Sequence, residues 1–534
     1  MISNMNKLNV LFSTACTEIT QNLLIIEEPT KKQVKAEIKK ICAKYALERI
    51  PRNHEILSTV KDADFFKLQK VLLKKPIKTA SGVSIIALMP KPYACPHGRC
   101  TYCPGGIEYN SPNSYTGKEP STLNAIENEY DPKLQIISKI EKLIAYGHDP
   151  SKMEIVIVGG TFLFMPKDYQ ENFIKSCYDA LNGIDSNGLE EAKSNNEHAK
   201  IRNVGFTIET KPDYCKQKHI DAMLDYGITR IEIGVQSLQE RVYKIVNRGH
   251  NYNDVIESFQ ISKDAGYKIV AHMMPGLPTM TPEGDISDFK KLFEDPQLRP
   301  DMLKIYPSLV IENTPLYVEY KRGEYTPYSD QDMIKVLTEV KKNVPKWVRI
   351  MRVQREISPN EIIAGPKSGN LRQIVQQNLS KQGMSCKCIR CREAGLSNKK
   401  THEQDIKLNR VDYESSGGNE IFLAYEDTNE SIYGFLRLRK PSILAHRKEV
   451  ENNSCIVREL HVYGKSLKLG EKGENEIQHS GLGKNLMKEA EKISKEEFDA
   501  VKLLVISAVG TREYYQKLGY SLYGPYMTKS LNKE

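Results

Sequence analysis

The spacing of hydrophobic residues divides the chain into segments with different expected secondary structure. Up to about residue 80, apolar residues recur every three or four positions among lysines, as in Val34, Ile38, Ile41 and Tyr45, which predicts helices. Further along, short apolar runs rich in β-branched residues predict strands, and segments of helical length separate them. These runs cover residues 81–89, 153–161, 203–213, 230–237, 267–278, 302–307 and 347–353.

Strands that alternate with helices predict an α/β fold with a parallel sheet, either open or closed into a barrel. In such folds the reacting groups gather at the carboxyl ends of the strands. The glycines and polar residues at these ends are Gly159, Gly160, Glu209, Gln236 and His272. The polar stretch 185–203 interrupts the pattern, and we expect it to be an excursion on the surface.

A different pattern follows in the last quarter of the chain. The stretch 358–410 has little strand character, whereas "NEIFLAYED", "SIYGFLRLRK" and "SCIVRELHVYG" alternate like antiparallel strands. A helix, a strand and a second helix come next, which predicts a small α+β domain. The predicted domains are a helical basic segment at 1–80, the α/β domain at 81–360, a cysteine-containing linker at 361–410 and the α+β domain at 411–534.

Composition narrows the class of protein. A chain of 534 residues needs several cores, and a hydrophobic content of 40% is enough to build them. No stretch approaches the ~20 apolar residues of a membrane span, and the first residues lack a signal-peptide pattern, so we expect a soluble cytoplasmic protein without membrane association. Eleven cysteines, an odd number, suit metal binding in a reducing compartment better than a disulfide framework.

The net charge of +9 is unevenly distributed. Many lysines fall in the predicted N-terminal helices and just before the first strand: Lys31, Lys32, Lys35, Lys39, Lys40, Lys44, Lys67, Lys70, Lys74, Lys75 and Lys78. A basic patch of this kind can follow a phosphate backbone. An ordinary solvated helix face is the alternative, and charge alone does not decide between them.

Two tight groups of cysteines indicate metal chemistry. Cys95, Cys100 and Cys103 have the spacing C-x4-C-x2-C directly after the first predicted strand. Thiolates select iron–sulfur clusters or zinc, and three ligands on a four-iron cluster would leave one iron open. The alternative is a structural zinc site completed by His97. The second group is Cys386, Cys388 and Cys391, for which metal binding competes with three free thiols on a loop.

The segment "QHSGLGKNLMKEAE" at 478–491 carries another signal. Its glycine-rich turn precedes an amphipathic helix with Leu486, Met487 and Ala490 on one face. Backbone amides at such a turn and at a helix N-terminus form an anion site that suits a pyrophosphate. The alternative is a glycine-rich helix cap with no ligand.

The first cysteine group resembles that of the radical S-adenosylmethionine (SAM) superfamily, in which the open iron of a 4Fe–4S cluster binds SAM. The commonest spacing in that superfamily is C-x3-C-x2-C, so one extra residue is a departure. The resemblance extends to "VGGT", whose Gly159 and Gly160 would approach the methionine end of SAM, and to Glu209 and Gln236 as polar contacts to the cofactor.

The C-terminal domain resembles GNAT-type acetyltransferases, which bind acetyl-CoA. The resemblance assigns the pantetheine arm to the strand residues Glu459, Leu460, His461 and Val462. It assigns the pyrophosphate to the loop residues Gln478, Gly481, Leu482, Gly483 and Lys484. Tyr514 and Tyr515 would lie near the thioester, although such tyrosines are more often core residues.

The combination of both domains is similar to the family of Elongator catalytic subunits over essentially the whole chain. Ordered segments that carry the resemblance include "CTYCPGG", "VGGTF", "IETKPDYC", "TRIEIGVQS", "NRGH", "LKIYPSLV", "VRELHVYG" and "GPYM". The short cysteine spacing and the segment "CKCIRC" are similar to the archaeal and bacterial branch. That branch implies a structural zinc on Cys386, Cys388 and Cys391; the fourth ligand is unassigned, and His402 is the nearest histidine.

The resemblance implies a tRNA-modifying acyltransferase. A 5′-deoxyadenosyl radical from SAM would remove hydrogen from the methyl group of acetyl-CoA, and the acetyl radical would add to C5 of the wobble uridine. Loss of an electron and a proton, with thioester hydrolysis, would leave 5-carboxymethyluridine. Lys39, Lys40 and Lys44 would then contact tRNA, while Lys152 and Tyr515 would contact acetyl-CoA.

Two other functions compete with this interpretation. The first is a protein lysine acetyltransferase that uses only the C-terminal domain. The second is a tRNA-binding or assembly protein with a degenerate site, which the intact cysteines and glycine-rich loop disfavour. The sequence leaves open whether other Elongator-type subunits are needed.

Overall fold

The computed structural model describes residues 2–47, 49–60, 64–72, 82–394, 405–451, 453–463 and 481–532. The chain forms two compact units, residues 1–84 with 136–152, and residues 85–135 with 153–534. No helix among the described residues is long and apolar enough to cross a membrane.

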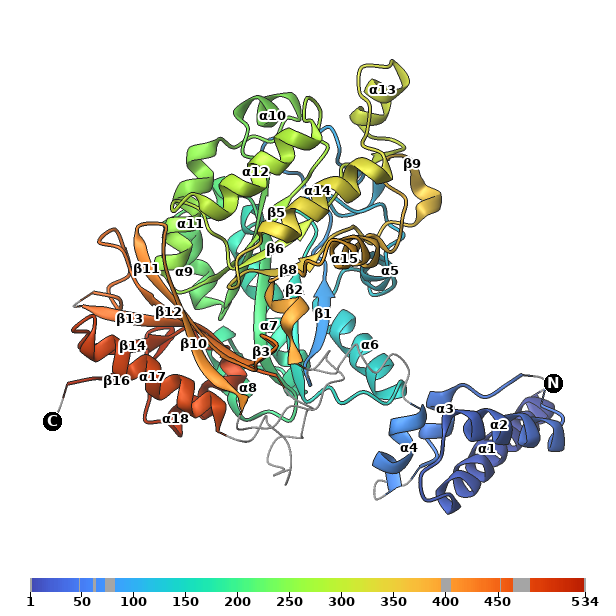
Figure 1. The fold of residues 1–534 in the computed structure, drawn as a ribbon. Helices are drawn as coiled ribbons and strands as arrows, with labels where there is room; N and C mark the ends of the chain where they lie inside the picture. The colour runs from blue at the N-terminus through green and yellow to red at the C-terminus, as the bar shows by residue number, and fades with distance from the viewer. Residues whose placement is uncertain are drawn as a thin grey trace. The chain divides into compact units, whose positions relative to one another are not determined.

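The first unit contains the predicted N-terminal helices (Figure 1). They are α1 (Ile2–Ile25), α2 (Lys31–Lys44), α3 (Asn53–Leu57) and α4 (Phe65–Leu72). The Thr30 side chain caps α2 and accepts from the amide of Gln33. Val34 and Ile38 of α2 join a buried core with residues of α1 and α3, while the lysines of α2 stay exposed. The helical prediction is therefore confirmed.

A seven-stranded sheet forms the centre of the second unit. Its order is β1 (Ser84–Leu88), β2 (Lys152–Ile157), β3 (Arg202–Thr210), β4 (Arg230–Gln236), β5 (Lys268–Met273), β6 (Met302–Ile305) and β8 (Arg349–Arg352). The pairs from β3 through β8 are parallel. Each strand falls within or overlaps a run predicted from the sequence, which confirms a partial (β/α) barrel (Figure 1).

Helices connect these strands. They are α5 (Pro120–Glu127), α6 (Pro132–Ala145), α7 (Lys167–Asn182), α8 (Leu189–His198), α9 (Gln217–Asp225), α10 (Glu240–Ile245), α11 (Tyr252–Asp264), α12 (Pro282–Glu294), α13 (Pro315–Lys321) and α14 (Asp330–Asn343). The stretch 185–203, expected to be an excursion on the surface, has many exposed residues but contains the unpredicted helix α8, which packs on α7. Its Asn196 is fully buried and donates to Asn182 of α7.

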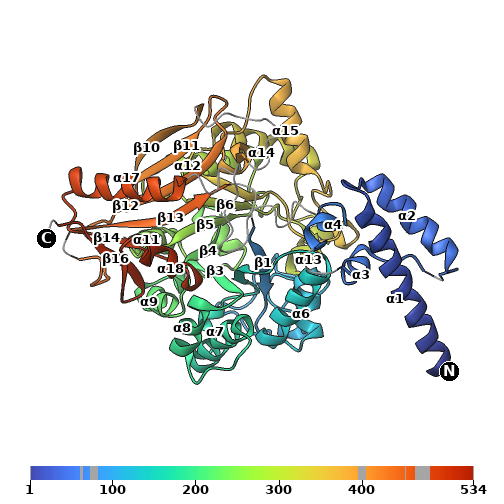
Figure 2. The same ribbon diagram turned by 90° about the horizontal axis from the view of Figure 1, so that it is seen from below.

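The linker and C-terminal domain follow. The linker contains β9 (Ile362–Ala364), which pairs with β7 (Val310–Ile311), then α15 (Leu371–Lys381) and α16 (Ile389–Arg392). The second sheet has the order β10 (Lys407–Ser415), β11 (Gly418–Glu426), β12 (Ile432–Lys440), β13 (Ser454–Val462), β14 (Lys502–Val505), β16 (Tyr526–Ser530) and β15 (Ser521–Tyr523). The helices of this domain are α17 (Leu482–Glu496) and α18 (Arg512–Gln516), and α17 lies along the sheet (Figure 2).

Buried ion pairs join the C-terminal sheet to the barrel. Asp301, directly before β6, accepts from both terminal nitrogens of Arg458 on β13, at 2.6 and 2.7 Å. Asp264, at the end of α11, accepts from Arg439 on β12 at 2.6 Å. All four side chains are fully buried. Since breaking a buried pair costs several kcal/mol, the two domains form one body.

Candidate active site

The first cysteine group lies in the loop after β1. Cys100 and Cys103 are buried, and Cys95 is half-buried. The Cys103 sulfur accepts from the Ser114 amide at 3.2 Å, and the Cys100 sulfur lies 3.8 Å from Nη1 of Arg248. Amide and cationic donors to sulfur are among the features that tune iron–sulfur clusters.

Apolar side chains surround these cysteines. Cys100 and Cys103 share a buried cluster with Val242, Val246 and Met274, among others. Burial, together with the neighbouring Cys103 and Cys100, raises the pKa of the Cys95 thiol to about 11. Thiolates in such a setting need positive charge beside them, which a metal cluster supplies together with Arg248 and Lys211.

A single zinc ion completed by His97 was the alternative for the first cysteine group. Tetrahedral zinc with Zn–S bonds of ~2.3 Å brings its sulfurs to roughly 3.8 Å from one another. Among the described residues, two groups have three ligand atoms all within 4.8 Å, and neither contains Cys95, Cys100 or Cys103. His97 Nε2 lies 3.2 Å from the Cys100 sulfur, and its Nδ1 lies 2.9 Å from Lys211 Nζ. Three cysteines on one loop are also the ligand set of a 4Fe–4S cluster with one open iron.

The glycine pair after β2 has a conformation that other residues rarely adopt. Gly159 and Gly160 have φ of +101° and +113°. A Cβ on Gly159 would lie 2.8 Å from the Cβ of Pro112. The positive φ and the close approach of Pro112 therefore require glycine at position 159, at the carboxyl end of β2.

Charged side chains fill the barrel interior next to this edge. Glu209 of β3, Glu232 of β4, His272 of β5 and Lys304 of β6 come together there. His272 Nε2 lies 2.8 Å from Glu232, and Lys304 donates to Glu232 while standing 3.8 Å from Glu209. The two carboxylates and His272 are close enough to hold a metal, but the Lys304 ammonium already occupies the group as its counter-ion.

Burial and charge oppose each other in this group. Burial raises the pKa of Glu209, and Lys304 and His272 act against that rise. Burial would also raise the pKa of Glu232, but Lys304 and the hydrogen bond from His272 outweigh it and hold that pKa well below its ordinary value. The Oε1 atom of Glu232 and the Oε1 atom of Gln236 are buried without a hydrogen-bond partner in the described part of the chain. Such atoms suit a polar ligand.

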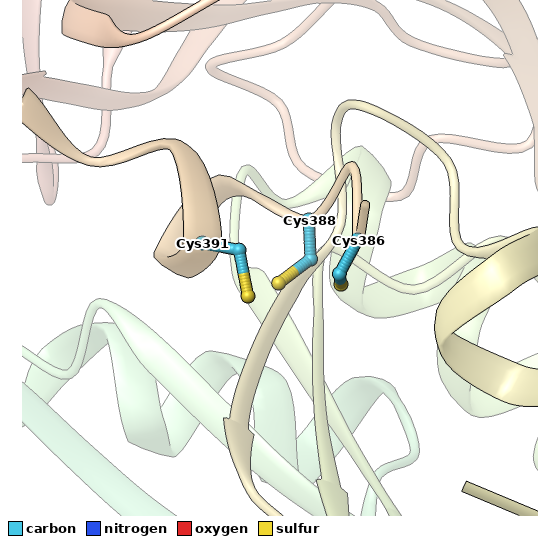
Figure 3. A group of neighbouring side chains, drawn as sticks. All are labelled: Cys386, Cys388 and Cys391. Carbon is cyan, nitrogen blue, oxygen red and sulfur yellow. The ribbon is translucent and has the colours of Figure 1, made fainter. Parts of the chain in front are cut away.

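The second cysteine group is compact. The sulfurs of Cys386, Cys388 and Cys391 lie within 4.8 Å of one another and converge on one point (Figure 3). Hydrogen bonds from Cys386 and Cys391 hold the pKa of Cys388 low. Lys341, which is fully buried, lies 3.8 Å from the Cys391 sulfur. This geometry fits tetrahedral zinc, and His402 lies outside the described residues.

The C-terminal sheet opens where acetyl-CoA is expected. β13 pairs with β14 from Ser454 to Val457, and β14 ends at Val505 while β13 continues to Val462. Among the described residues, the β13–β14 pairing thus ends at Val457, before Glu459, Leu460 and His461. The confirmed helix α17 begins beside this opening, with Gly481 at φ +83° as its N-cap, while Gln478 lies outside the described residues.

The tyrosines of α18 take different positions. A Cβ on Gly483 would lie 2.8 Å from the Tyr514 hydroxyl, so Tyr514 closes over the first turn of α17. Tyr514 is 41% exposed, whereas Tyr515 is 7% exposed and packs in the core of the domain. The ring that faces the opening of the sheet is thus that of Tyr514.

Comparison with known proteins adds the family. Residues 89–292 match the Radical SAM superfamily, 300–381 the Radical_SAM C-terminal domain, and 12–80 the ELP3 N-terminal domain. The chain is 47% identical to the tRNA uridine(34) acetyltransferase of Methanocaldococcus jannaschii over 491 residues, 90% of each chain. It is 44% identical to Elongator complex protein 3 of Saccharomyces cerevisiae, covering 97% of this chain and 96% of that protein. The chain belongs to the Elp3 family.

A solved Elp3 structure agrees with this assignment. The archaeal Methanocaldococcus infernus Elp3 with N-terminus deletion (1-46) matches with a TM-score of 0.75 at 43% identity, covering 85% of this chain and all of that one. The predicted family and the radical SAM fold class are therefore confirmed.

The remaining predicted residues of this Elp3 chain lie in the first unit. Lys39, Lys40 and Lys44 are exposed on α2, and Lys44 forms an ion pair with Glu18 at 2.6 Å. Lys152 is the first residue of β2, and burial lowers its pKa.

Sequence reasoning missed several residues of the Elp3 site. Arg248 and Lys211 lie beside the cysteine loop, and Glu232 and Lys304 lie beside Glu209. These residues lie in the motifs "NRGH", "IETKPD", "RIEIGVQS" and "LKIYP". The motifs do not show which charged side chains pair, because the segments that carry them are far apart in the sequence.

Proposed function

We propose that this chain modifies the wobble uridine of tRNA and adds a carboxymethyl group derived from acetyl-CoA to C5 of the base. The observation that carries the proposal is the union of two sites in one body. The cysteine loop and the open edge of β13 belong to the same compact unit, which the Asp301–Arg458 pair holds together. An archaeal relative bears the name tRNA uridine(34) acetyltransferase, which supports the substrate.

The barrel would hold the redox cofactors. Cys95, Cys100 and Cys103 would bind a 4Fe–4S cluster, and Gly159, Gly160, Glu209 and Gln236 would contact SAM. When bound, this pair supplies a 5′-deoxyadenosyl radical by reductive cleavage of SAM. Arg248 would offset negative charge at Cys100, and the apolar side chains around Cys103 would keep water away.

The C-terminal domain would hold acetyl-CoA. The backbone of Glu459, Leu460, His461 and Val462 would bind the pantetheine arm, and the pyrophosphate would lie at Gln478, Gly481, Leu482, Gly483 and Lys484. Lys152 would contact acetyl-CoA as well. Tyr514 and Tyr515 would shape the thioester end, Tyr514 by contact and Tyr515 from the core beneath it.

Zinc and RNA would occupy the other predicted sites. Cys386, Cys388 and Cys391 would bind a structural zinc ion. The loop that carries them joins β8 to the C-terminal sheet, since Ile389 donates to Val348 O and Arg392 pairs with Glu426 of β11 at 2.7 Å. Lys39, Lys40 and Lys44 would contact tRNA phosphates. Partner subunits of an Elongator type remain compatible with the fold.

A protein lysine acetyltransferase is the weaker proposal. On β13, Arg458 donates to the barrel residue Asp301. The next residue, Glu459, accepts from Arg437, which also donates to the carbonyl of Trp347. The barrel thus covers the face of β13 next to the expected thioester. A lysine from another protein would have to displace the barrel to reach this face of β13.

Nucleoside analysis tests the proposal. Iron-reconstituted protein would be incubated without oxygen with SAM, dithionite, acetyl-CoA and tRNA, and the nucleosides analysed by mass spectrometry. We expect a carboxymethyl mass on uridine that requires acetyl-CoA and disappears in Cys100→Ser. Formation of 5′-deoxyadenosine with unchanged uridine would contradict the substrate. Acetylation of a protein that survives Cys100→Ser would favour the acetyltransferase.

A further inference from the structure

Three aromatic side chains in contact, two exposed and one half-buried, form a continuous group on the second unit, which we call the aromatic rim: Tyr93, Phe164 and Tyr214. The ring centroids of Tyr93 and Phe164 are 5.8 Å apart and those of Phe164 and Tyr214 are 5.6 Å apart, both edge to face. Tyr93 is 40% exposed and Phe164 is 37% exposed.

The aromatic rim lies at the mouth of the barrel. Its members follow β1, β2 and β3 in turn, so they stand at the carboxyl ends of neighbouring strands. Tyr93 precedes Cys95 by two residues, and its carbonyl accepts from Asn113 Nδ2 at 2.7 Å. A Cβ on Gly160 would lie 3.4 Å from that same nitrogen. The platform therefore borders both the cysteine loop and the glycine pair.

Core packing does not explain the exposure. In the short turn Phe162–Phe164, Phe162 is 2% exposed and packs on Phe173, whereas Phe164 faces outward. Burying a phenylalanine typically contributes about 1.5–3 kcal/mol, which an outward ring forgoes. The turn thus supplies one ring to the core and leaves the next one available for a ligand.

We propose that the aromatic rim stacks unpaired bases of the RNA substrate next to the nucleotide that enters the barrel. This inference rests on the proposed function. Within residues 89–103, 158–166 and 210–219, the large apolar side chains that are well exposed are Tyr93 and Phe164, with no aliphatic one beside them. An unpaired base can stack on the face of an exposed aromatic ring. Exposed Lys91 and Lys218 flank the platform and suit phosphates.

Binding of an anticodon stem-loop RNA to the full chain, followed by fluorescence anisotropy, tests this role. Stacking on one aromatic ring contributes 1–3 kcal/mol per base, so Phe164→Ala should weaken binding roughly 5- to 150-fold. Phe164→Leu should be as weak as Phe164→Ala, because it keeps the apolar surface but not the ring, and Phe164→Trp should bind as the wild type does. Tyr523→Ala, which removes a ring 46% exposed on β15, is the matched control and should bind normally.

The outcomes separate this inference from the proposed function. If the wild type binds the stem-loop and Phe164→Ala and Tyr93→Ala bind equally well, the aromatic rim has no RNA role. If Phe164→Leu binds the stem-loop RNA as tightly as the wild type does, an apolar contact is enough for binding. The inference that the ring stacks on a base then fails. If the wild type does not bind RNA at all, the proposed function itself fails. An unchanged thermal unfolding midpoint confirms that each variant is folded.

Discussion

The ammonium nitrogen of Lys304 lies 3.8 Å from a carboxylate oxygen of Glu209 and donates a hydrogen bond to Glu232. These residues come from β6, β3 and β4, so three strands of one sheet place one buried cation between two carboxylates. If Glu209 contacts SAM, Lys304 is the cation that most opposes the rise that burial causes in the pKa of Glu209.

Removing Lys304 should therefore change how SAM binding depends on pH. A raised pKa means that Glu209 is protonated, and SAM released, at a higher pH as the solution is acidified. The charges that face Glu209 are Lys304, His272, Glu232 and Arg352. We expect Lys304→Met to move the pH midpoint of SAM binding upward, because the pKa of Glu209 then loses the cation that lowers it most. Equilibrium binding to the cluster-loaded protein measures it.

Matched variants make that result specific. Glu232→Gln removes a negative neighbour, so its midpoint should move downward. Lys335→Met, which removes an exposed lysine paired with Glu283, should leave the midpoint unchanged. Should Lys304→Met fail to fold because Glu232 is left unpaired, the double variant with Glu232→Gln relieves that charge. Shifts of the same sign in Lys304→Met and Glu232→Gln would contradict the assignment.

The two cysteine groups should lose different metals. Cys103→Ser should abolish the iron content and the visible absorption of the reconstituted protein and leave zinc at one ion per chain. Cys388→Ser should do the reverse and lower the thermal midpoint, since a structural zinc stabilises the fold. Elemental analysis of both variants decides this, with Cys177→Ser, a buried cysteine outside both groups, as the control. Zinc retained in Cys388→Ser would refute the second site.

The Asp301–Arg458 pair should stabilise the union of the two domains. Asp301→Asn removes one of the two buried carboxylates that pair with Arg458, the other being Glu420, and should cost up to about 3–5 kcal/mol. The lower thermal midpoint of this variant should be accompanied by a weaker attachment of the C-terminal domain in limited proteolysis. Asp412→Asn, which removes an exposed carboxylate paired with Arg410, is expected to change stability by less than about 0.5 kcal/mol.

The difference in stability between the wild type and Asp301→Asn should depend on pH, because the pKa of Asp301 is shifted. Burial alone would raise that pKa, but Arg458 and Lys263 outweigh burial and hold it far below its ordinary value. A depressed carboxyl pKa contributes stability above the unfolded-state pKa of about 3.9, and the contribution declines as the pH falls below it. The difference in the free energy of unfolding between the wild type and Asp301→Asn should accordingly become smaller below about pH 4. A gap that widens on acidification would contradict the ion-pair account.

Gly483 tests the acetyl-CoA site. Its substitution by alanine places a methyl group 2.8 Å from the Tyr514 hydroxyl, which must move. We expect Gly483→Ala to weaken acetyl-CoA binding at least tenfold, about 1.4 kcal/mol, in calorimetry. Adding Tyr514→Phe removes the hydroxyl and should restore part of the affinity. Gly369→Ala, whose Cβ would meet open space, is the control, and equal affinity in all variants would remove Tyr514 from the site.

Strong periodicity made most of the fold predictable. The runs at 230–237 and 267–278 became β4 and β5 because β-branched residues buried on both faces leave few alternatives. β10 was missed because "KLNRVDYES" is an edge strand with mostly exposed residues, so it lacks a hydrophobic signal. The helix α8 was missed for the related reason that its buried positions, such as Lys193 and Asn196, are polar.

The candidate site was predictable where one local motif defines it. The glycine pair and both cysteine groups are local, and the structure gives positive φ at Gly159 and Gly160 and brings the sulfurs of Cys386, Cys388 and Cys391 together. Lys304 and Arg248 could not be predicted as members of the site, because their contacts with Glu209 and Cys100 cross many residues of sequence. The different positions of Tyr514 and Tyr515 depend on the rotation of one short helix, which no pattern of two adjacent tyrosines can define.

Deuterium transfer from acetyl-CoA measures the central claim, that one reaction uses both domains. Reconstituted protein with SAM, a reductant and tRNA would receive acetyl-CoA labelled with three deuterium atoms on the methyl group. The account predicts one deuterium in the 5′-deoxyadenosine produced and two in the carboxymethyl group on uridine. Unlabelled 5′-deoxyadenosine together with unmodified uridine would show that the barrel does not act on acetyl-CoA, and the account would be wrong.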